Sequence, residues 1–352
     1  MQLKAPGTIA LVVALAAIVF LSGCQLRSHF DQPPAEKREL SVDKGGSDMP
    51  DTNRGAVNVP ATVLWSAPGK LRDYDELILR ENSDPAGWSA SMDPAMRLWL
   101  VGKADTMALY GEPVFILERQ GAWLKVAAVE QKTKLNEQGY PGWTPAAHIV
   151  NSNAYLADLK NLPKVAVVKK TAPVYLDEAL TQAVGEAPYQ TRLPLLRTNS
   201  GFVEVRLPSG GTGYLAGDDV KAEAHLTFSR SGIVSEAGKF SGLPYLWAGT
   251  APYGFDCSGF TMRLYQSQGI TIPRDADEQA LAGTAVARQD LLPGDLLFYA
   301  AKGGVGQIHH VGMYIGDGLM IHSPNSASTV RAEAMDSGSY GDEYWGARRY
   351  SP

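Results

Sequence analysis

The segment Asp256-Cys257-Ser258-Gly259-Phe260 decides how this 352-residue sequence is interpreted. Phe260 and Leu264 recur at helical spacing, and Gly269 ends the run. The pattern predicts a helix that begins at Cys257, with Asp256 and Ser258 as candidate capping residues. A thiol at a helix N-terminus lies beside unpaired backbone N–H groups, which favour the thiolate. The segment therefore predicts a nucleophilic cysteine.

Strand-like segments that follow this helix supply candidate bases. They lie at 294–299, 310–315 and 319–322, and helices followed by an antiparallel sheet indicate an α+β domain. Neighbouring antiparallel strands bring side chains of one face to within about 5 Å. We therefore predict that His310 is the base and that His322 orients its ring. His309 points to the opposite face and is expected to be structural or exposed.

Further segments of roughly the last third of the chain occur together with these residues. They are Tyr245-x-Trp247-Ala-Gly249, Pro273-Arg274, Leu292-Pro-Gly-Asp-Leu-Leu-Phe298, His310-Val-Gly-Met-Tyr-Ile-Gly316, Met320-Ile-His322-Ser323 and Tyr344-Trp345-Gly-Ala-Arg-Arg349-Tyr350. In these segments the chain resembles the NlpC family of papain-like cell-wall peptidases. The resemblance implies that Cys257 is the nucleophile, His310 the general base and acid, and His322 the orienting residue. It implies no metal and no other cofactor.

The N-terminus indicates export. Lys4 precedes the apolar run 9–21, whose thirteen residues would form a helix of about 20 Å, shorter than a bilayer core of about 30 Å. We therefore predict a signal peptide over 1–23. Ser22-Gly23-Cys24 resembles the bacterial lipobox, which implies a lipid on Cys24. By resemblance to lipoprotein sorting, Gln25 implies the outer membrane, facing the periplasm.

The rest of the chain divides by composition. Residues 24–60 are polar and predict a lipidated flexible tether, and residues 61–100 predict a small helical or irregular cap. Short strands separated by Gly and Pro predict a β-barrel over 101–155, and a similar pattern returns over 156–225. Both resemble bacterial SH3-type (SH3b) modules. The expected fold is multidomain, with two small all-β SH3b-like barrels followed by an α+β papain-like domain over 226–352.

The net charge and the two cysteines limit the classes of partner and the roles open to Cys257. The formal net charge is −5 without a strongly basic block, which argues against a nucleic-acid partner. Cys24 and Cys257 are the two cysteines of the sequence. A lipid on Cys24 would leave Cys257 without a disulfide partner, although exported proteins usually pair their cysteines. A lone thiol in such a compartment is either buried or functional.

The combination of lipobox, tether and two SH3b-like modules resembles the subgroup that cleaves γ-D-glutamyl–L-diamino acid bonds in murein peptides. This implies two partners, peptidoglycan stem peptides and a membrane reached through the lipid. It also implies that Tyr245, Asp256 and Ser258 line the substrate cleft, with Asp256 meeting the free amine of an N-terminal L-Ala. The first SH3b module would add a Tyr and an acidic residue, for which Tyr140 and Glu112 are the candidates.

Three alternatives remain open from the sequence. Cys257, His310 and His322 would suffice as ligands of a catalytic zinc, although no CxxC or HxxxH spacing occurs in the sequence. The chain would otherwise be a non-catalytic peptidoglycan-binding lipoprotein, if its last domain had lost activity. The same fold would also serve an amidase acting on another murein bond, since no motif here sets the shape of the cleft.

Overall fold

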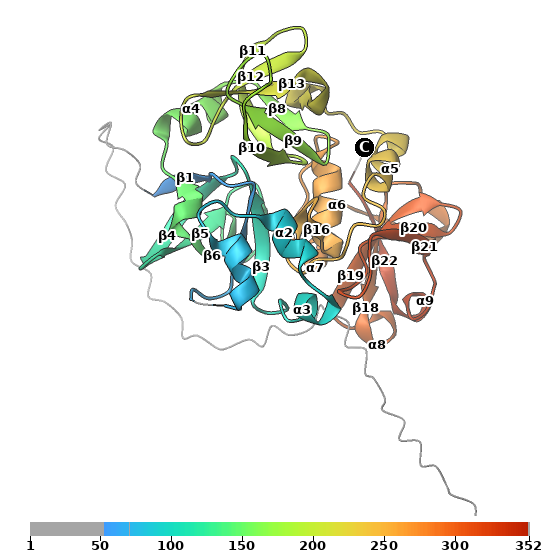
Figure 1. Cartoon of the computed structure of the whole chain (residues 1–352). Helices are drawn as coiled ribbons and strands as arrows, with labels where there is room; N and C mark the ends of the chain where they lie inside the picture. The colour runs from blue at the N-terminus through green and yellow to red at the C-terminus, as the bar shows by residue number, and fades with distance from the viewer. Residues whose placement is uncertain (1–52, 70, 351–352) are drawn as a thin grey trace, which may run out of the picture.

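The computed structural model describes residues 53–69 and 71–350, which form two β-barrels and a C-terminal domain with the predicted catalytic residues (the catalytic domain), packed together (Figure 1). The predicted signal peptide, the lipobox with Cys24 and most of the predicted tether lie outside these residues. Within the described ranges, none of the helices has the length and apolar character needed to cross a membrane.

The first barrel is a sheet of seven antiparallel strands in the order β3-β2-β6-β5-β4-β1-β7. Its inward-facing side chains, among them Leu64, Val114 and Val126, form a buried core. The strand bounds are β1 Arg54–Val57, β2 Ala61–Trp65, β3 Ala104–Leu109, β4 Pro113–Gln120, β5 Trp123–Ala128, β6 Tyr140–Pro145 and β7 Ile149–Val150.

The second barrel repeats this topology strand for strand, in the order β10-β9-β13-β12-β11-β8-β14. Its bounds are β8 Lys164–Val167, β9 Thr171–Tyr175, β10 Ala183–Pro188, β11 Arg192–Thr198, β12 Phe202–Arg206, β13 Thr212–Ala216 and β14 Val220–Ala222. Helix α4 (Asn153–Asn161) joins the barrels. Its buried Tyr155 packs into the second barrel and donates a hydrogen bond to the carbonyl of Gly111 at 2.8 Å. The predicted internal repeat is confirmed.

The predicted start of the first barrel at residue 101 is wrong. Strands β1 and β2 belong to its sheet, so the barrel begins inside the segment predicted as a tether. Residues 66–103 are an insertion between β2 and β3, whereas residues 176–182 make the equivalent connection in the second barrel. The insertion separates β1 and β2 from the later strands in sequence, and β2 is buried throughout, so it lacks the alternation that identifies a half-buried strand.

The insertion contains the short helices α1 (Glu76–Leu79), α2 (Pro85–Ala90) and α3 (Pro94–Leu98). Helices α2 and α3 each begin at a proline that follows a capping aspartate. Trp88 of α2 is fully buried and packs edge-on against Trp65, with ring centroids 6.2 Å apart. This apolar cluster continues into the catalytic domain through Leu246 and Tyr253.

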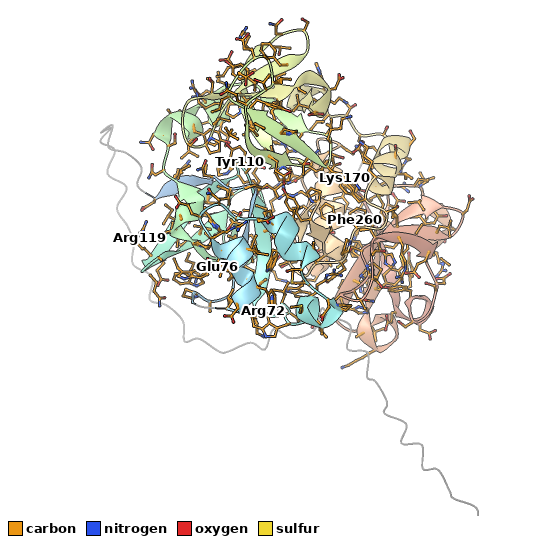
Figure 2. The ribbon with its side chains drawn as sticks, viewed as in Figure 1. Arg72, Glu76, Tyr110, Arg119, Lys170 and Phe260 are labelled. Atoms are coloured by element: carbon orange, nitrogen blue, oxygen red, sulfur yellow. The ribbon has the colours of Figure 1, made fainter. Side chains whose placement is uncertain are left out.

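The catalytic domain is α+β, as predicted. Its six-stranded antiparallel sheet has the order β17-β22-β18-β19-β20-β21, and the buried helix α6 packs against β19. Phe260 of α6 lies in the interior (Figure 2). The bounds are α5 Arg230–Gly238, β15 Thr250–Ala251, β16 Gly254–Phe255, α6 Cys257–Gln266, α7 Ala276–Leu281, β17 Thr284–Val286, β18 Leu296–Ala300, α8 Ala301–Gly304, β19 Ile308–Gly316, β20 Leu319–His322, β21 Arg331–Ala334, α9 Tyr340–Glu343 and β22 Tyr344–Arg349.

Helix α6 contacts both barrels through polar side chains. Arg263 is fully buried, and its Nη2 lies 2.6 Å from Oε1 of Glu112 in the first barrel. Arg192 of the second barrel donates to the carbonyl of Gln266 at 3.1 Å. A buried charge is tolerated only when it is paired and hydrogen-bonded. These contacts therefore fix the orientation of α6, and with it the position of Cys257, relative to both barrels.

Candidate active site

The start of α6 positions Cys257. Oδ1 of Asp256 accepts a hydrogen bond from the backbone N–H of Gly259 at 2.7 Å, which is a helix N-cap. A side chain at residue 259 would collide with the carbonyl oxygen of Gly249, so glycine allows the preceding loop to pack against the first turn. Cys257 is consequently the first helical residue, and its thiol lies at the positive end of the helix.

His310 of β19 is hydrogen-bonded to the thiol of Cys257. Both side chains are buried, with 3% of each residue exposed. Burial lowers the pKa of His310, and the contact with Cys257 partly opposes that shift. The imidazole is therefore held in its neutral form, in which it can accept the thiol proton.

His322 at the end of β20 lies against the far side of His310. Nε2 of His310 and Nδ1 of His322 are 2.7 Å apart. Gly312 makes room for this contact, because a Cβ there would lie 2.8 Å from Sδ of Met320 and 3.3 Å from Cβ of His322. The predicted juxtaposition of Cys257, His310 and His322 is thus present.

The spacing of the two rings does not suit a shared zinc ion. Two nitrogens that each bind one tetrahedral zinc at about 2.0–2.1 Å lie about 3.3 Å apart, whereas these two atoms are at the 2.7 Å separation of a direct hydrogen bond. No group of three or more His, Cys, Asp or Glu among residues 53–69 and 71–350 is arranged to hold a metal. The geometry fits proton transfer between the rings and the thiol.

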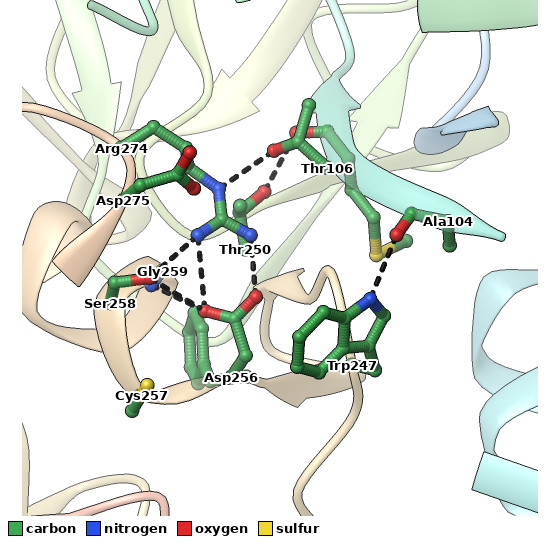
Figure 3. A network of polar contacts seen from close by, with 12 residues as sticks. Ala104, Thr106, Trp247, Thr250, Asp256, Cys257, Ser258, Gly259, Arg274 and Asp275 are labelled. Atoms are coloured by element: carbon green, nitrogen blue, oxygen red, sulfur yellow. Dashed lines mark hydrogen bonds and ion pairs between the residues drawn. The ribbon is translucent and has the colours of Figure 1, made fainter. Parts of the chain in front are cut away.

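A second polar cluster adjoins Cys257, centred on the buried Arg274 (Figure 3). Its Nη2 lies 2.5 Å from Oδ2 of Asp256, and its Nη1 donates to Oγ of Ser258 at 2.9 Å. Its Nε donates to Oγ1 of Thr106 at 2.8 Å. Because Thr106 belongs to β3, the first barrel directly helps to build this side of the site.

Tyr140 of β6 also reaches this cluster. Its hydroxyl donates a hydrogen bond to Oδ2 of Asp275 at 3.0 Å, and Asp275 follows Arg274 in the chain. Asp256 and Asp275 together carry two negative charges against the one positive charge of Arg274. Three charges so arranged leave one negative charge in excess, which is complementary to an ammonium group.

Tyr245 lies beside this cluster. It forms an isolated bridge with Phe255, the residue before Asp256, and its side chain is buried. The structure thus brings the predicted residues Tyr245, Asp256, Ser258 and Tyr140 into the neighbourhood of Cys257.

Comparison with known proteins agrees with this geometry. The NlpC/P60 family model matches residues 242–349, and the YKFC SH3b2 domain model matches residues 167–222. A gamma-D-glutamyl-L-lysine dipeptidyl-peptidase of Bacillus cereus is 40% identical over 311 residues, which cover 85% of this chain and 92% of that relative. The chain belongs to the NlpC/P60 family.

Two further comparisons extend this result. A gamma-D-glutamyl-L-lysine dipeptidyl-peptidase of Bacillus subtilis is 32% identical over 288 residues, which cover 81% of this chain and 95% of that relative. The crystal structure of an NlpC/P60 family protein from Bacillus cereus matches with a TM-score of 0.81 and 40% identity, covering 85% of this chain and 100% of that one. The chain is accordingly a peptidase of the NlpC/P60 family, with the fold class predicted from its sequence.

Glu112 does not occupy the place in this NlpC/P60 site that we predicted. Its carboxylate is buried against Arg263, in the second half of α6, and also accepts a hydrogen bond from Gln131 at 3.3 Å. Glu112 is therefore the counter-charge of a buried arginine at a domain boundary. The acidic residue that Tyr140 contacts is Asp275, which belongs to the catalytic domain.

Sequence reasoning missed a carboxylate behind the histidines. Oε1 of Glu333, on β21, lies 2.5 Å from Nε2 of His322. Burial lowers the pKa of His322 to about 3, and the nearby Arg331 adds to that shift. His322 is consequently neutral at neutral pH. The available signal was the spacing of Arg331 and Glu333, two polar residues at alternate positions of one segment. From the sequence we predict no strand there.

Proposed function

We propose that this chain is a cysteine peptidase that hydrolyses the bond between γ-D-glutamyl and an L-diamino acid in peptidoglycan stem peptides. The observation that carries this proposal is the hydrogen-bonded line from Cys257 at the start of α6 through His310 to His322. Relatives from two Bacillus species, each aligned over most of its length, are named gamma-D-glutamyl-L-lysine dipeptidyl-peptidases. The substrate in these names supports the bond that we assign.

Acylation begins with transfer of the thiol proton of Cys257 to His310. Because Nε2 of His310 faces His322, Nδ1 is the nitrogen left for that proton. The thiolate attacks the γ-carbonyl carbon of D-Glu, and the carbonyl oxygen becomes an oxyanion. Backbone N–H groups of the first turn of α6 are placed to stabilise this oxyanion. His310 then gives its proton to the departing amine as the C–N bond breaks, which leaves a thioester.

Deacylation uses the same groups in reverse roles. His310 takes a proton from water, and the resulting hydroxide attacks the thioester carbonyl. The C–S bond breaks, the product leaves with a γ-carboxylate, and Cys257 recovers its proton from His310. The proton that the thiol gave to the amine is thus replaced by one from water, and the new carboxylic acid releases its proton to solvent. The chemistry is thus complete with residues of this chain.

Recognition of an L-Ala amine involves the charged cluster next to Cys257. Asp256 is already paired with Arg274, so the carboxylate of Asp275 supplies the excess negative charge of the cluster. Tyr140 holds that carboxylate from the first barrel. An ammonium group bound here would place a short N-terminal segment, such as L-Ala-γ-D-Glu, between the cluster and the nucleophile. Such a site limits cleavage to peptides with a free amine.

Defined peptides test both parts of the proposal. L-Ala-γ-D-Glu-L-Lys with its amine free or acetylated should be incubated with wild type, Cys257→Ala and Tyr140→Phe, and the products identified by mass spectrometry. We expect wild type to release L-Ala-γ-D-Glu from the free peptide, and Cys257→Ala to release none. Cleavage by Cys257→Ala would overturn the nucleophile, and equal cleavage of the acetylated peptide would overturn amine recognition. Cleavage at another bond, or binding without cleavage, would support the amidase or the binding protein instead.

We also propose that the chain is exported and lipid-anchored at Cys24, at the outer membrane facing the periplasm. Support comes from the sequence of residues 1–25, with an apolar run that ends in Leu21-Ser22-Gly23-Cys24. Radiolabelled palmitate should label the expressed wild type in a bacterial host but not Cys24→Ser. Equal labelling of both would overturn the lipid assignment, and recovery of the wild type in inner-membrane fractions would overturn the location.

A further inference from the structure

We propose that Glu333 is a positioning residue of this active site, whose carboxylate fixes the tautomer of His322 and thereby leaves a bare nitrogen of His310 facing the thiol of Cys257. The inference rests on the proposed peptidase function and adds a fourth member to the line of three residues.

The geometry of the sheet places Glu333 at the end of this line. The register of β20 and β21 pairs His322 with Arg331, so Glu333 is the diagonal neighbour of His322 on the same face. Across β19 and β20, Met313 pairs with Ile321, so residue 312 lies opposite His322. His310, two residues before 312, is therefore the diagonal neighbour of His322 on the same face. The three side chains therefore cross three adjacent strands as one connected row.

The carboxylate is fixed as an acceptor from its other sides. Oε1 of Glu333 accepts from Nη2 of Arg331 at 3.0 Å, and Oε2 accepts from Oγ of Ser337 at 3.0 Å. A carboxylate in this state offers only lone pairs to a neighbouring ring. Nε2 of His322, 2.5 Å from Oε1, must therefore carry a hydrogen and donate it.

This constraint propagates along the row because each neutral imidazole has one hydrogen. With its hydrogen on Nε2, His322 presents a bare Nδ1, which accepts from Nε2–H of His310 at 2.7 Å. His310 then has no hydrogen on Nδ1, which is the nitrogen left for Cys257. The opposite tautomer of His322 would place a hydrogen on that nitrogen of His310 and prevent it from accepting the thiol proton.

Other groups facing the two rings do not set this direction. Tyr340 stacks on His310 with centroids 5.3 Å apart and lies edge-on to His322, and Tyr299 also contacts His310. These are ring–ring contacts, which neither supply nor remove a proton at the ring nitrogens. Arg331 is cationic and disfavours protonation of His322. Among the described neighbours of His322, Glu333 is thus the acceptor that defines the tautomer of that ring.

A matched control, Glu343 of α9, lies beside the same sheet. His309 adjoins His310 on the opposite face of β19, and its Nε2 lies 3.3 Å from Oε2 of Glu343. His309 is buried, with 6% of the residue exposed. The side chains of Glu333 and Glu343 are similarly exposed, at 21% and 24%. Glu343 therefore pairs with a histidine at comparable burial, but its partner is not in the line that leads to Cys257.

The test compares Glu333→Met, which removes the acceptor at similar volume, with Glu333→Gln and Glu343→Met. On the free-amine peptide we expect Glu333→Met to lose about 10- to 100-fold in kcat with KM changed less than about threefold, by analogy with residues that orient metal-binding histidines. Glu333→Gln, which keeps an oxygen acceptor, should recover part of the loss, and Glu343→Met should match wild type. Nitrogen-15 NMR should show a hydrogen on Nε2 of His322 in wild type and a mixture of tautomers in Glu333→Met.

Two results would overturn the proposal. One is wild-type kcat and an unchanged His322 tautomer in Glu333→Met. The other is an equal loss in Glu343→Met, which would indicate general damage to the sheet. Failure of the proposed function is distinguishable, because wild type would then cleave nothing while the tautomer measurement would still report on Glu333.

Discussion

Arg274 and Asp256 form a buried ion pair, with Nη2 and Oδ2 2.5 Å apart, immediately before the residue that we assign as nucleophile. Asp256 also caps α6. One carboxylate thus stabilises the helix that presents Cys257 and is neutralised by an arginine that contacts the first barrel through Thr106. The site is assembled across a domain boundary.

Replacement of Arg274 tests this arrangement. Arg274→Met leaves Asp256 buried without its cation, so we expect the free energy of unfolding to fall by about 3–5 kcal/mol and kcat/KM to fall with it. Urea denaturation followed by tryptophan fluorescence measures the first effect. Arg97→Met in the insertion is a control outside this cluster. An unchanged stability of Arg274→Met would show that the ion pair contributes little.

Tyr140→Phe removes the hydroxyl that donates to Asp275. A hydrogen bond to a charged group contributes about 1.5–3 kcal/mol, so we expect kcat/KM for the free-amine peptide to fall about 10-fold or more. The effect should appear mainly in KM, because Tyr140 contacts recognition groups rather than the reacting atoms. Steady-state kinetics measure it, with Tyr214→Phe in the second barrel as the control. Unaltered KM would remove Tyr140 from recognition.

Gly259→Ala tests the close approach of the loop that contains Gly249 to the first turn of α6. The added methyl would collide with the carbonyl of Gly249, and such overpacking costs about 1–3 kcal/mol. We expect a loss of stability of that size and a large drop in kcat, because Cys257 moves with the helix start. The counterpart Gly238→Ala in α5 meets no atom within 4 Å and should be slightly stabilising. Similar behaviour of the two variants would contradict this account.

The buried histidines predict how stability depends on pH. Burial lowers the pKa of His322 to about 3, below the value of about 6.5 that the ring has when unfolded. The unfolded state therefore binds the proton first, and stability is lost as pH falls below about 6.5, by up to about 1.4 kcal/mol per pH unit for one such ring. His322→Gln should flatten the dependence between pH 7 and 5 in denaturation curves. Parallel curves for variant and wild type would disprove it.

Glu112→Ala tests the structural role of the Arg263 pair. Removing one partner of a buried ion pair costs about 3–5 kcal/mol because the other charge remains buried. The double variant Glu112→Leu with Arg263→Met should recover much of this loss, since it removes both charges. A double-mutant cycle of unfolding free energies gives the coupling between the two residues. Additive effects would show that the pair is uncoupled.

Local sequence patterns predicted the catalytic domain well. Cys257, which we expected to begin a helix, is the first residue of α6, and the predicted strand 319–322 matches β20. These elements are continuous in sequence and their periodicity is clear. The positions of His310 and His322 follow from the pairing of two consecutive strands, which adjacent segments of an antiparallel sheet usually adopt.

Contacts between distant segments were not predictable in the same way. Glu333 meets His322 only through the register of β21, and Asp275 meets Tyr140 only because the first barrel docks on the catalytic domain. The role of Glu112 depends on a buried arginine in another domain. Local patterns contain no information about such pairings, and an acidic residue after a glycine is equally suited to a turn or a binding site.

The helical insertion between β2 and β3 interrupts a hairpin whose two strands stay paired. The sheet therefore closes in the same way as in the second barrel, where the equivalent connection is short. Ser89 in this connection donates to the carbonyl of Tyr253 at 2.5 Å, in the hairpin that leads into Cys257. A change in the insertion would thus be transmitted through Ser89 to the hairpin before Cys257, while the residues that perform the chemistry stay unchanged.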